Sequence, residues 1–272
     1  MRAEAGPPIR AMGIVETQAI VIQTFKLADA DKIAVCMTEK AGLIRGVARG
    51  ARRLKSKFGA SLEPFTLIRL TYFEKESREL VTIKESEILK SYFGAAQDAE
   101  VVRALGYLAE LVKEFAPPHQ PDERLFRMLR ACIEATANNP KLFHAITVYT
   151  ELWTLKLTGL LPEARECGSC GARLGGPGVG AYISQEGALR CQSCRQGGWQ
   201  RIGAEEHELL ASMRVRGPKD WAETFEATSD VGRQSVSDIA GRLVRRALER
   251  EPRASRSPHT AARTDGGGGI DE

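Results

Sequence analysis

The segment TQAIVIQTF, at residues 17–25, is the first of five strand-like segments, because its β-branched residues predict a strand and four similar segments follow it. Polar or glycine-containing turns separate the other four, which lie at residues 32–38, 42–48, 64–73 and 80–88. Five short strands in so little chain favour a small closed barrel such as the OB-fold.

From about residue 97 the spacing of apolar residues changes to three and four, which predicts helices. The first predicted helix ends before Pro117, Asp122 can cap the second, and the third runs from near Pro140 to near Gly159. Helical patterns return at residues 204–213 and 235–250. The fold class expected is therefore α+β and multidomain.

The domain organisation follows from these changes of pattern. We expect a flexible leader (1–13), an OB-fold barrel (14–92), an α-helical domain (93–250) with an inserted zinc segment (163–198), and a disordered tail (251–272). The tail is rich in Arg, Ser, Pro and Gly, a composition that cannot bury a core.

The composition describes an ordinary protein of 272 residues, of which 43% are hydrophobic and 27% charged. No apolar run approaches the roughly 20 residues that cross a bilayer, and the N-terminus lacks the apolar core of a signal peptide. We therefore expect a cytoplasmic protein without a membrane partner. The net charge of +4 is too small to indicate a partner by itself.

Two cysteine pairs, Cys167-Gly-Ser-Cys170 and Cys191-Gln-Ser-Cys194, carry the spacing of a zinc site. Two such turns supply four thiolates to one tetrahedral ion. Four protein ligands leave no position for water or substrate, so we expect one structural zinc ion. The alternative, a redox pair, requires a βαβ context that this glycine-rich segment lacks.

The remaining reactive side chains do not indicate an enzyme. Cys36 and Cys132 lie alone in apolar segments and are expected to be small buried hydrophobes. The four histidines are scattered along the chain, and their spacing fits neither a metal site nor a catalytic triad. They are His119, His144, His207 and His259. A phosphate-binding Gly-Lys-Ser/Thr loop is missing from the sequence.

Between residues 40 and 62 every charged residue is positive: Lys40, Arg45, Arg49, Arg52, Arg53, Lys55 and Lys57. A barrel that presents such a loop suits nucleic-acid binding, with affinity from phosphate contacts. The alternative is a solvated surface. Phe58, inside the loop, is either a base-stacking side chain or a core residue, whereas Phe25, Tyr72 and Phe73 are expected in the core.

The sequence GVARGARRLKSKFG at residues 46–59 resembles the signature of the RecO family of recombination mediators. Similar matches are LEPF (62–65), ADADKI (28–33) and YTELWTLKLTGLLP (149–162), which leads into the first cysteine pair. The resemblance implies DNA contacts at Arg45, Arg49, Arg52, Arg53, Lys55 and Lys57, with Lys26 and Lys32 as possible additions.

The same resemblance implies a DNA repair function without catalysis. Members of the family bind single- and double-stranded DNA, anneal complementary strands and assist RecA loading onto SSB-coated DNA, with RecR and the acidic C-terminal tail of SSB as partners. A nucleoid-associated location is implied as well. Since the last helix matches the family weakly, no residues are assigned to the SSB-tail site.

Two other classes of function stay open at this point. Barrels with zinc segments also serve as RNA-binding modules. A non-catalytic interaction scaffold, whose basic loop meets acidic protein surfaces, is the third possibility.

Overall fold

The computed structural model describes residues 13–75, 80–92, 98–161, 163–175 and 180–248. Residues 1–12 of the expected leader and the whole expected tail lie outside the described residues. The chain divides into two compact units, residues 1–94 with 116–130, and residues 95–115 with 131–272. Pro118 forms a bridge with Leu43, so residues after the first helix pack with the strands.

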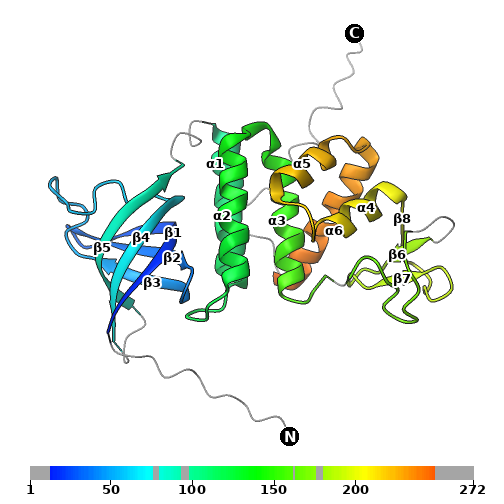
Figure 1. Cartoon of the computed structure of the whole chain (residues 1–272), viewed down its shortest axis with the longest axis horizontal. Coiled ribbons are helices and arrows are strands. Elements are labelled where there is room, and N and C mark those ends of the chain that lie inside the picture. The colour runs from blue at the N-terminus through cyan, green and yellow to red at the C-terminus, as the bar shows by residue number, and fades with distance from the viewer. Residues whose placement is uncertain (1–12, 76–79, 93–97, 162, 176–179, 249–272) are drawn as a thin grey trace, which may run out of the picture. The chain divides into compact units, whose positions relative to one another are not determined.

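The first unit contains five strands that close into a barrel (Figure 1). They are β1 (Gly13–Leu27), β2 (Asp31–Thr38), β3 (Gly42–Ala48), β4 (Thr66–Glu74) and β5 (Leu80–Ser91). The order around the barrel is β1-β2-β3-β5-β4, and β4 pairs with β1 to close it. Only the β3–β5 pair among these strands is parallel. The predicted OB-like barrel is confirmed.

The barrel interior is filled by small and β-branched side chains from all five strands, including Ala34, Ile44 and Val81. Gly46 of β3 faces this interior, where a Cβ would lie 2.7 Å from a side-chain carbon of Ile83. Only a residue without a side chain lets β5 approach β3 so closely.

A bulge in β1, between Val21 and Gln23, reverses which residues face the interior. Val21 lies in the core, but beyond the bulge it is Thr24 that pairs with the core residue Ala34. Phe25 therefore points outward, and its side chain is 41% exposed. The expectation that Phe25 belongs to the core is wrong, because strict alternation from Val21 does not survive the bulge.

The connection between β3 and β4 folds back onto the barrel. Ala51, Phe58 and Leu62 join the barrel core, and Phe58 is only 3% exposed. Phe58 is thus a core residue and offers no face for base stacking. The connection ends at Phe65, which has a left-handed backbone conformation (φ +61°) directly before β4 begins.

The second unit is helical, as predicted (Figure 1). Its helices are α1 (Ala99–Phe115), the C-terminal half of α2 (Glu123–Asn138), α3 (Phe143–Leu157), α4 (Ala204–Ser212), α5 (Pro218–Glu226) and α6 (Asp230–Leu248), and a short 3-10 turn, η2 (Pro140–Leu142), precedes α3. The sequence patterns did not predict α5. Among the described residues, no helix combines the length and apolarity needed to span a membrane.

The helix ends follow the predicted signals. The Leu125 N–H donates to Asp122 Oδ1 at 2.9 Å, so Asp122 caps α2. Gly159 ends the third helix with a φ of +75°, a conformation that glycine adopts without steric cost.

Aromatic side chains join α3, α4 and α5. The Trp221 indole N–H donates to the Leu209 carbonyl at 2.8 Å, and the Trp153 indole N–H donates to the Met213 carbonyl at 3.1 Å. Trp221 is fully buried, and its ring stacks on Phe225. These donors bond carbonyls in the last turn of α4 and at its C-cap residue, where a helix runs out of backbone N–H partners.

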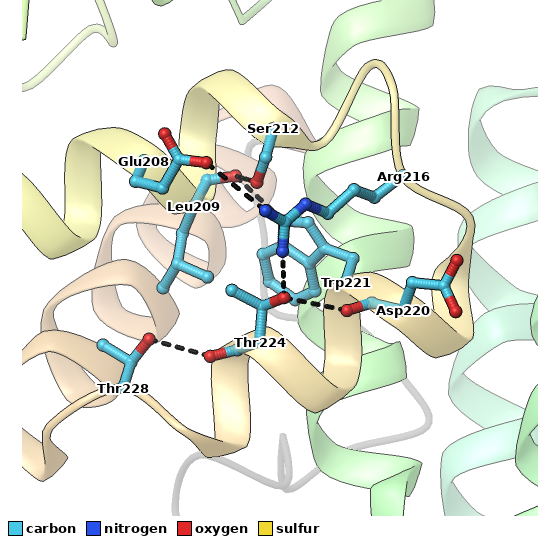
Figure 2. Close-up of polar contacts among 8 residues, drawn as sticks. All are labelled: Glu208, Leu209, Ser212, Arg216, Asp220, Trp221, Thr224 and Thr228. Carbon is cyan, nitrogen blue, oxygen red and sulfur yellow. Dashed lines mark hydrogen bonds and ion pairs between the residues drawn. The ribbon is translucent and has the colours of Figure 1, made fainter.

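Arg216 completes the junction between α4 and α5. Figure 2 shows its guanidinium between Glu208 of α4 and Thr224 of α5. It donates to the Thr224 hydroxyl and lies 3.7 Å from Glu208 Oε1. Its carbonyl accepts a hydrogen bond from the Tyr149 hydroxyl at 3.0 Å. The junction is therefore held by side chains from three helices.

Candidate nucleic-acid interface and metal site

The basic connection between β3 and β4 is tied to the turn between β1 and β2. The Gly50 N–H donates to Asp31 Oδ1 at 2.8 Å, and the Arg52 N–H donates to the Ala30 carbonyl at 2.9 Å. The Arg52 guanidinium also donates to the Ala28 carbonyl at 2.9 Å. Two loops that lie apart in the sequence thus form one end of the barrel.

The cations of this connection face solvent while its apolar residues face the core. All five are exposed, namely Arg49, Arg52, Arg53, Lys55 and Lys57. Arg45 is also exposed, on the outer surface of β3, because its neighbours Ile44 and Gly46 face the interior. No described acidic residue forms an ion pair with Arg45, Arg49, Arg52, Arg53 or Lys55. Their charges are therefore available to an external anion.

Lys26 and Lys32 differ from each other although they are partners in the β1–β2 register. Lys26 is exposed, whereas Lys32 Nζ lies 3.1 Å from Glu63 Oε1 and its side chain is 22% exposed. The charge of Lys32 is thus already balanced within the barrel.

Lys57 has mixed surroundings. Its ammonium lies 5.3 Å from the centre of the Phe58 ring, and its side chain lines a cleft of about 510 Å³. Three glutamates, Glu16, Glu85 and Glu87, line the same cleft. Arg69 lines the cleft as well and pairs with Glu16 at 3.9 Å and Glu87 at 2.5 Å, which leaves Glu85 as the carboxylate without a described ion pair. Since carboxylates share the cleft with Lys57, it is less suited to phosphate than the other loop cations.

Phe25 is a candidate that the sequence patterns did not indicate. The strand register aligns Phe25 of β1 with Ile33 of β2, and Ile33 with Val47 of β3. These three side chains form a partly exposed apolar row on the outer surface, and Val47 lies two residues before Arg49. An aromatic ring beside a basic loop is the usual design of a single-strand binding surface. The bulge that exposes Phe25 has no local sequence signal.

The four predicted zinc ligands come together in the second unit. Their sulfur atoms all lie within 4.8 Å of one another, and Cys170 Sγ is 3.8 Å from Cys191 Sγ. A tetrahedral ion with Zn–S bonds of ~2.3 Å separates its thiolates by ~3.8 Å. The four cysteines could therefore hold a metal ion, and their arrangement is consistent with zinc. In the described part of the chain they are the one such group of ligand side chains.

The local fold explains how the cysteines meet. Between α3 and α4 in the sequence, three short strands form a small sheet of order β7-β6-β8. They are β6 (Ala181–Ile183), β7 (Leu189–Cys191) and β8 (Gln200–Ile202). Each cysteine pair closes a tight turn, since the Gly171 N–H donates to Cys167 O at 2.9 Å and the Cys194 N–H to Cys191 O at 3.2 Å. The sheet places the second turn beside the first.

The thiols of the cluster have unequal acidity. Burial raises the pKa of Cys167, but hydrogen bonds from the backbone N–H groups of Cys170, Cys191 and Ser169 outweigh it and lower the pKa to about 6. Hydrogen bonds with the side chains of Cys170 and Cys191 raise the pKa of Cys194 to about 12. The cluster thus stabilises a thiolate, the form that binds metal.

The other two cysteines are buried, as expected. Burial raises the pKa of the Cys36 thiol and of the Cys132 thiol to about 12. Both are therefore uncharged packing residues.

Comparison with known proteins identifies similar chains. The family model described as "Recombination protein O N terminal" matches residues 12–92, and "Recombination protein O C terminal" matches residues 96–257. A protein named "DNA repair protein RecO" from Koribacter versatilis is 31% identical over 159 residues, which are 58% of this chain and 64% of that protein.

Two further proteins with the same printed name show longer matches. The Anaeromyxobacter sp. (strain K) protein is 28% identical over 75% of this chain and 80% of its own length. The Geobacter metallireducens protein is 30% identical over 76% of this chain and 82% of its own length.

Proposed function

This chain belongs to the RecO family, whose named members are DNA repair proteins, and from that premise we propose that it acts as a non-catalytic mediator of recombinational repair. In this proposal it binds single- and double-stranded DNA, anneals complementary strands and assists the loading of RecA onto SSB-coated DNA. We propose a cytoplasmic, nucleoid-associated location for this activity.

The observation that carries the DNA-binding proposal is the separation of charges and apolar groups in the connection between β3 and β4. Phe58 and Leu62 anchor the connection in the barrel core, and the cations that precede Phe58 are exposed and form no ion pair with a described carboxylate. Cations that meet phosphates release condensed counterions, which provides affinity without reading the base sequence. The main contacts proposed are Arg45, Arg49, Arg52, Arg53 and Lys55.

The remaining predicted contacts have a smaller place in this proposal. Lys26 is exposed and adds charge at the same end of the barrel. Lys57 lies beside an acidic cleft, and Lys32 is paired with Glu63, so neither is expected to dominate affinity.

Annealing needs no covalent chemistry. Two phosphate backbones repel each other, and a cationic surface lowers that repulsion while complementary bases pair. The exposed loop is suited to this because it holds phosphates and leaves the base edges free for pairing.

We propose that the four cysteines bind one structural Zn²⁺ ion. With all four positions taken by Cys167, Cys170, Cys191 and Cys194, the ion would hold the glycine-rich segment in shape and take no part in a reaction. Zinc sites of this type supply folding energy on the order of 10 kcal/mol.

The proposed protein partners rest on the family alone. They are RecR, the acidic C-terminal tail of SSB, and RecA indirectly. We assign no residues of this chain to these contacts.

The proposal is tested by reversing the charge of Arg49, Arg52 and Arg53 together to Glu. We expect single-strand affinity to fall about tenfold or more, and the slope of log K against log salt to lose about 2 units, since each single-strand phosphate contact contributes about 0.7. Fluorescence anisotropy over a series of salt concentrations measures both quantities. A triple variant of Arg124, Arg127 and Arg130, exposed on α2, carries the same charge change as a control.

Three results would contradict the proposal. Unchanged binding in the loop variant would remove the loop as the interface. Stronger retention of RNA than of DNA of the same sequence would favour the RNA-binding module. A wild-type protein that retains neither nucleic acid at low salt would favour the interaction scaffold.

A further inference from the structure

The small sheet of the metal-binding segment buries one face and leaves the other partly exposed. Each strand has three residues, and the first and last residues are mostly buried, including Ile183, Leu189 and Ile202. The middle residue of each strand points the opposite way, because side chains alternate along a strand. The register aligns these middle residues as Arg190, Tyr182 and Arg201 across β7, β6 and β8.

Two neighbouring side chains extend this row. The Arg195 guanidinium lies 4.7 Å from the centre of the Tyr182 ring. The Arg190 guanidinium lies 5.9 Å from the centre of the Trp199 ring, although Trp199 precedes β8 on the other side of β6. The indole therefore lies across the sheet. We call Tyr182, Arg190, Arg195, Trp199 and Arg201 the arginine–aromatic face.

The charges of this face are not balanced by acidic residues. None of its three arginines forms an ion pair with a described carboxylate, and Arg195 and Arg201 are exposed. Arg190 packs against Gly168 of the first cysteine turn, so part of its role is structural. The backbone N–H of Arg195 donates to Cys191 O at 3.1 Å, but no described carboxylate accounts for the exposed side chain of Arg195 or of Arg201 on this face.

We propose that the arginine–aromatic face is a second nucleic-acid-binding surface, which takes unpaired nucleotides. Aromatic rings and guanidinium planes stack on bases, and the same guanidinium groups bind phosphates. Stacking needs accessible base faces, so this surface favours single strands over duplex. The inference extends the proposed function, because annealing involves two strands, but it does not depend on the barrel loop.

The charge of the face is tested with Arg195→Glu and Arg201→Glu together in the full-length, zinc-loaded chain. Against a dT oligonucleotide we expect affinity to fall about five- to tenfold, and the salt slope to lose about 1.4 units, from two single-strand contacts. The neutral pair Arg195→Gln and Arg201→Gln is expected to show a smaller loss in the same direction. Bound zinc, measured by metal analysis, must be unchanged in both variants.

The stacking role is tested at Tyr182 and Trp199. We expect Tyr182→Leu to weaken dT binding about fivefold while duplex binding stays constant, and Tyr182→Phe to keep wild-type affinity. Bases that stack near an indole quench its fluorescence, so dT is expected to quench the wild-type protein, and Trp199→Phe to remove most of that quenching.

The matched control is the pair Arg165→Glu and Arg173→Glu, two exposed arginines of the same segment. We expect this pair to leave dT affinity within about twofold, which separates a specific surface from the net charge of the segment. Equal losses in the control pair and the face pair would overturn the proposal. So would a face pair that lowers binding of a polyglutamate peptide and leaves dT binding unchanged, since the face would then be a peptide site.

Failure of the arginine–aromatic face can be distinguished from failure of the proposed DNA-binding loop of the barrel. In the background of the triple loop variant, residual dT binding and Trp199 quenching are expected to persist, and to be lost when the face pair is added. If the loop variant binds like wild type while the face pair abolishes binding, the loop interface fails and the face stands. If quenching is absent in the wild type, the face fails whatever the loop does.

Discussion

The exposure of Phe25 and of Phe58 is the reverse of what their sequence neighbours suggest. Phe58 lies among cations, yet it packs in the barrel core, whereas Phe25 lies in an apolar strand, yet it is 41% exposed. The bulge after Val21 accounts for Phe25, and the closure of the barrel end accounts for Phe58. At the scale of single residues, exposure thus depends on strand register and on how the connecting loop closes the barrel.

Replacing Phe25 with Ala is expected to weaken single-strand binding about fivefold, because a base loses its stacking partner beside the basic loop. Binding to a duplex of the same length is expected to stay constant, since its bases are already stacked. Anisotropy titrations with the two ligands measure the difference.

Ile14→Ala provides the control for Phe25, because Ile14 is an exposed apolar residue of the same strand, at 73% exposure. It is expected to leave both affinities unchanged. Equal losses for single strands and duplex in the Phe25 variant would show that the ring serves the barrel and not the bases.

At the scale of elements, the junction between α4 and α5 shows how a short helix gains its stability from tertiary contacts. α5 has nine residues, and its sequence signals are weak apart from Pro218 in its first turn. Trp221 buries its ring against Phe225 and satisfies a carbonyl of α4 at the same time. Such a helix is stable because of its partners and not because of its own propensity.

Trp221→Phe is expected to lower the free energy of unfolding by about 2–4 kcal/mol, because it leaves a cavity and removes the donor to the Leu209 carbonyl. Urea unfolding followed by far-UV circular dichroism measures this change. The comparison is Trp153→Phe, which removes a similar hydrogen bond from a half-buried ring and is expected to cost about 1 kcal/mol. A larger loss of unfolding free energy in Trp153→Phe than in Trp221→Phe would contradict the conclusion that Trp221 is the main stabilising residue of the junction.

At the scale of the molecule, the chain keeps its proposed DNA loop and its metal site in different compact units. All three tryptophans, Trp153, Trp199 and Trp221, lie in the second unit. Tryptophan fluorescence therefore reports the unit that contains the cysteines, and DNA binding by the loop reports the barrel.

Removal of the metal with a strong chelator is expected to lower the midpoint of the tryptophan-monitored thermal transition, because the cysteine segment has little core of its own. In the variant with Arg195→Glu and Arg201→Glu, DNA binding through the barrel loop is expected to persist after chelation. Loss of that binding would show that the barrel depends on the metal site.

Features that depend on neighbouring residues could be predicted from the amino-acid sequence. The β-branched segments predicted five strands, Asp122 and Gly159 predicted helix ends, and the spacing of Cys167 and Cys170 predicted a metal turn. Each of these signals acts within a few residues, since strand propensity, capping and turn geometry are local.

Which side chains are available for binding depends on the tertiary structure. It buried Phe58, exposed Phe25, paired Lys32 with Glu63, and set Tyr182 between two arginines of other strands. The sequence patterns could not predict the burial, exposure and pairing of these side chains. Strand register, barrel closure and ion pairing join residues that are distant along the chain.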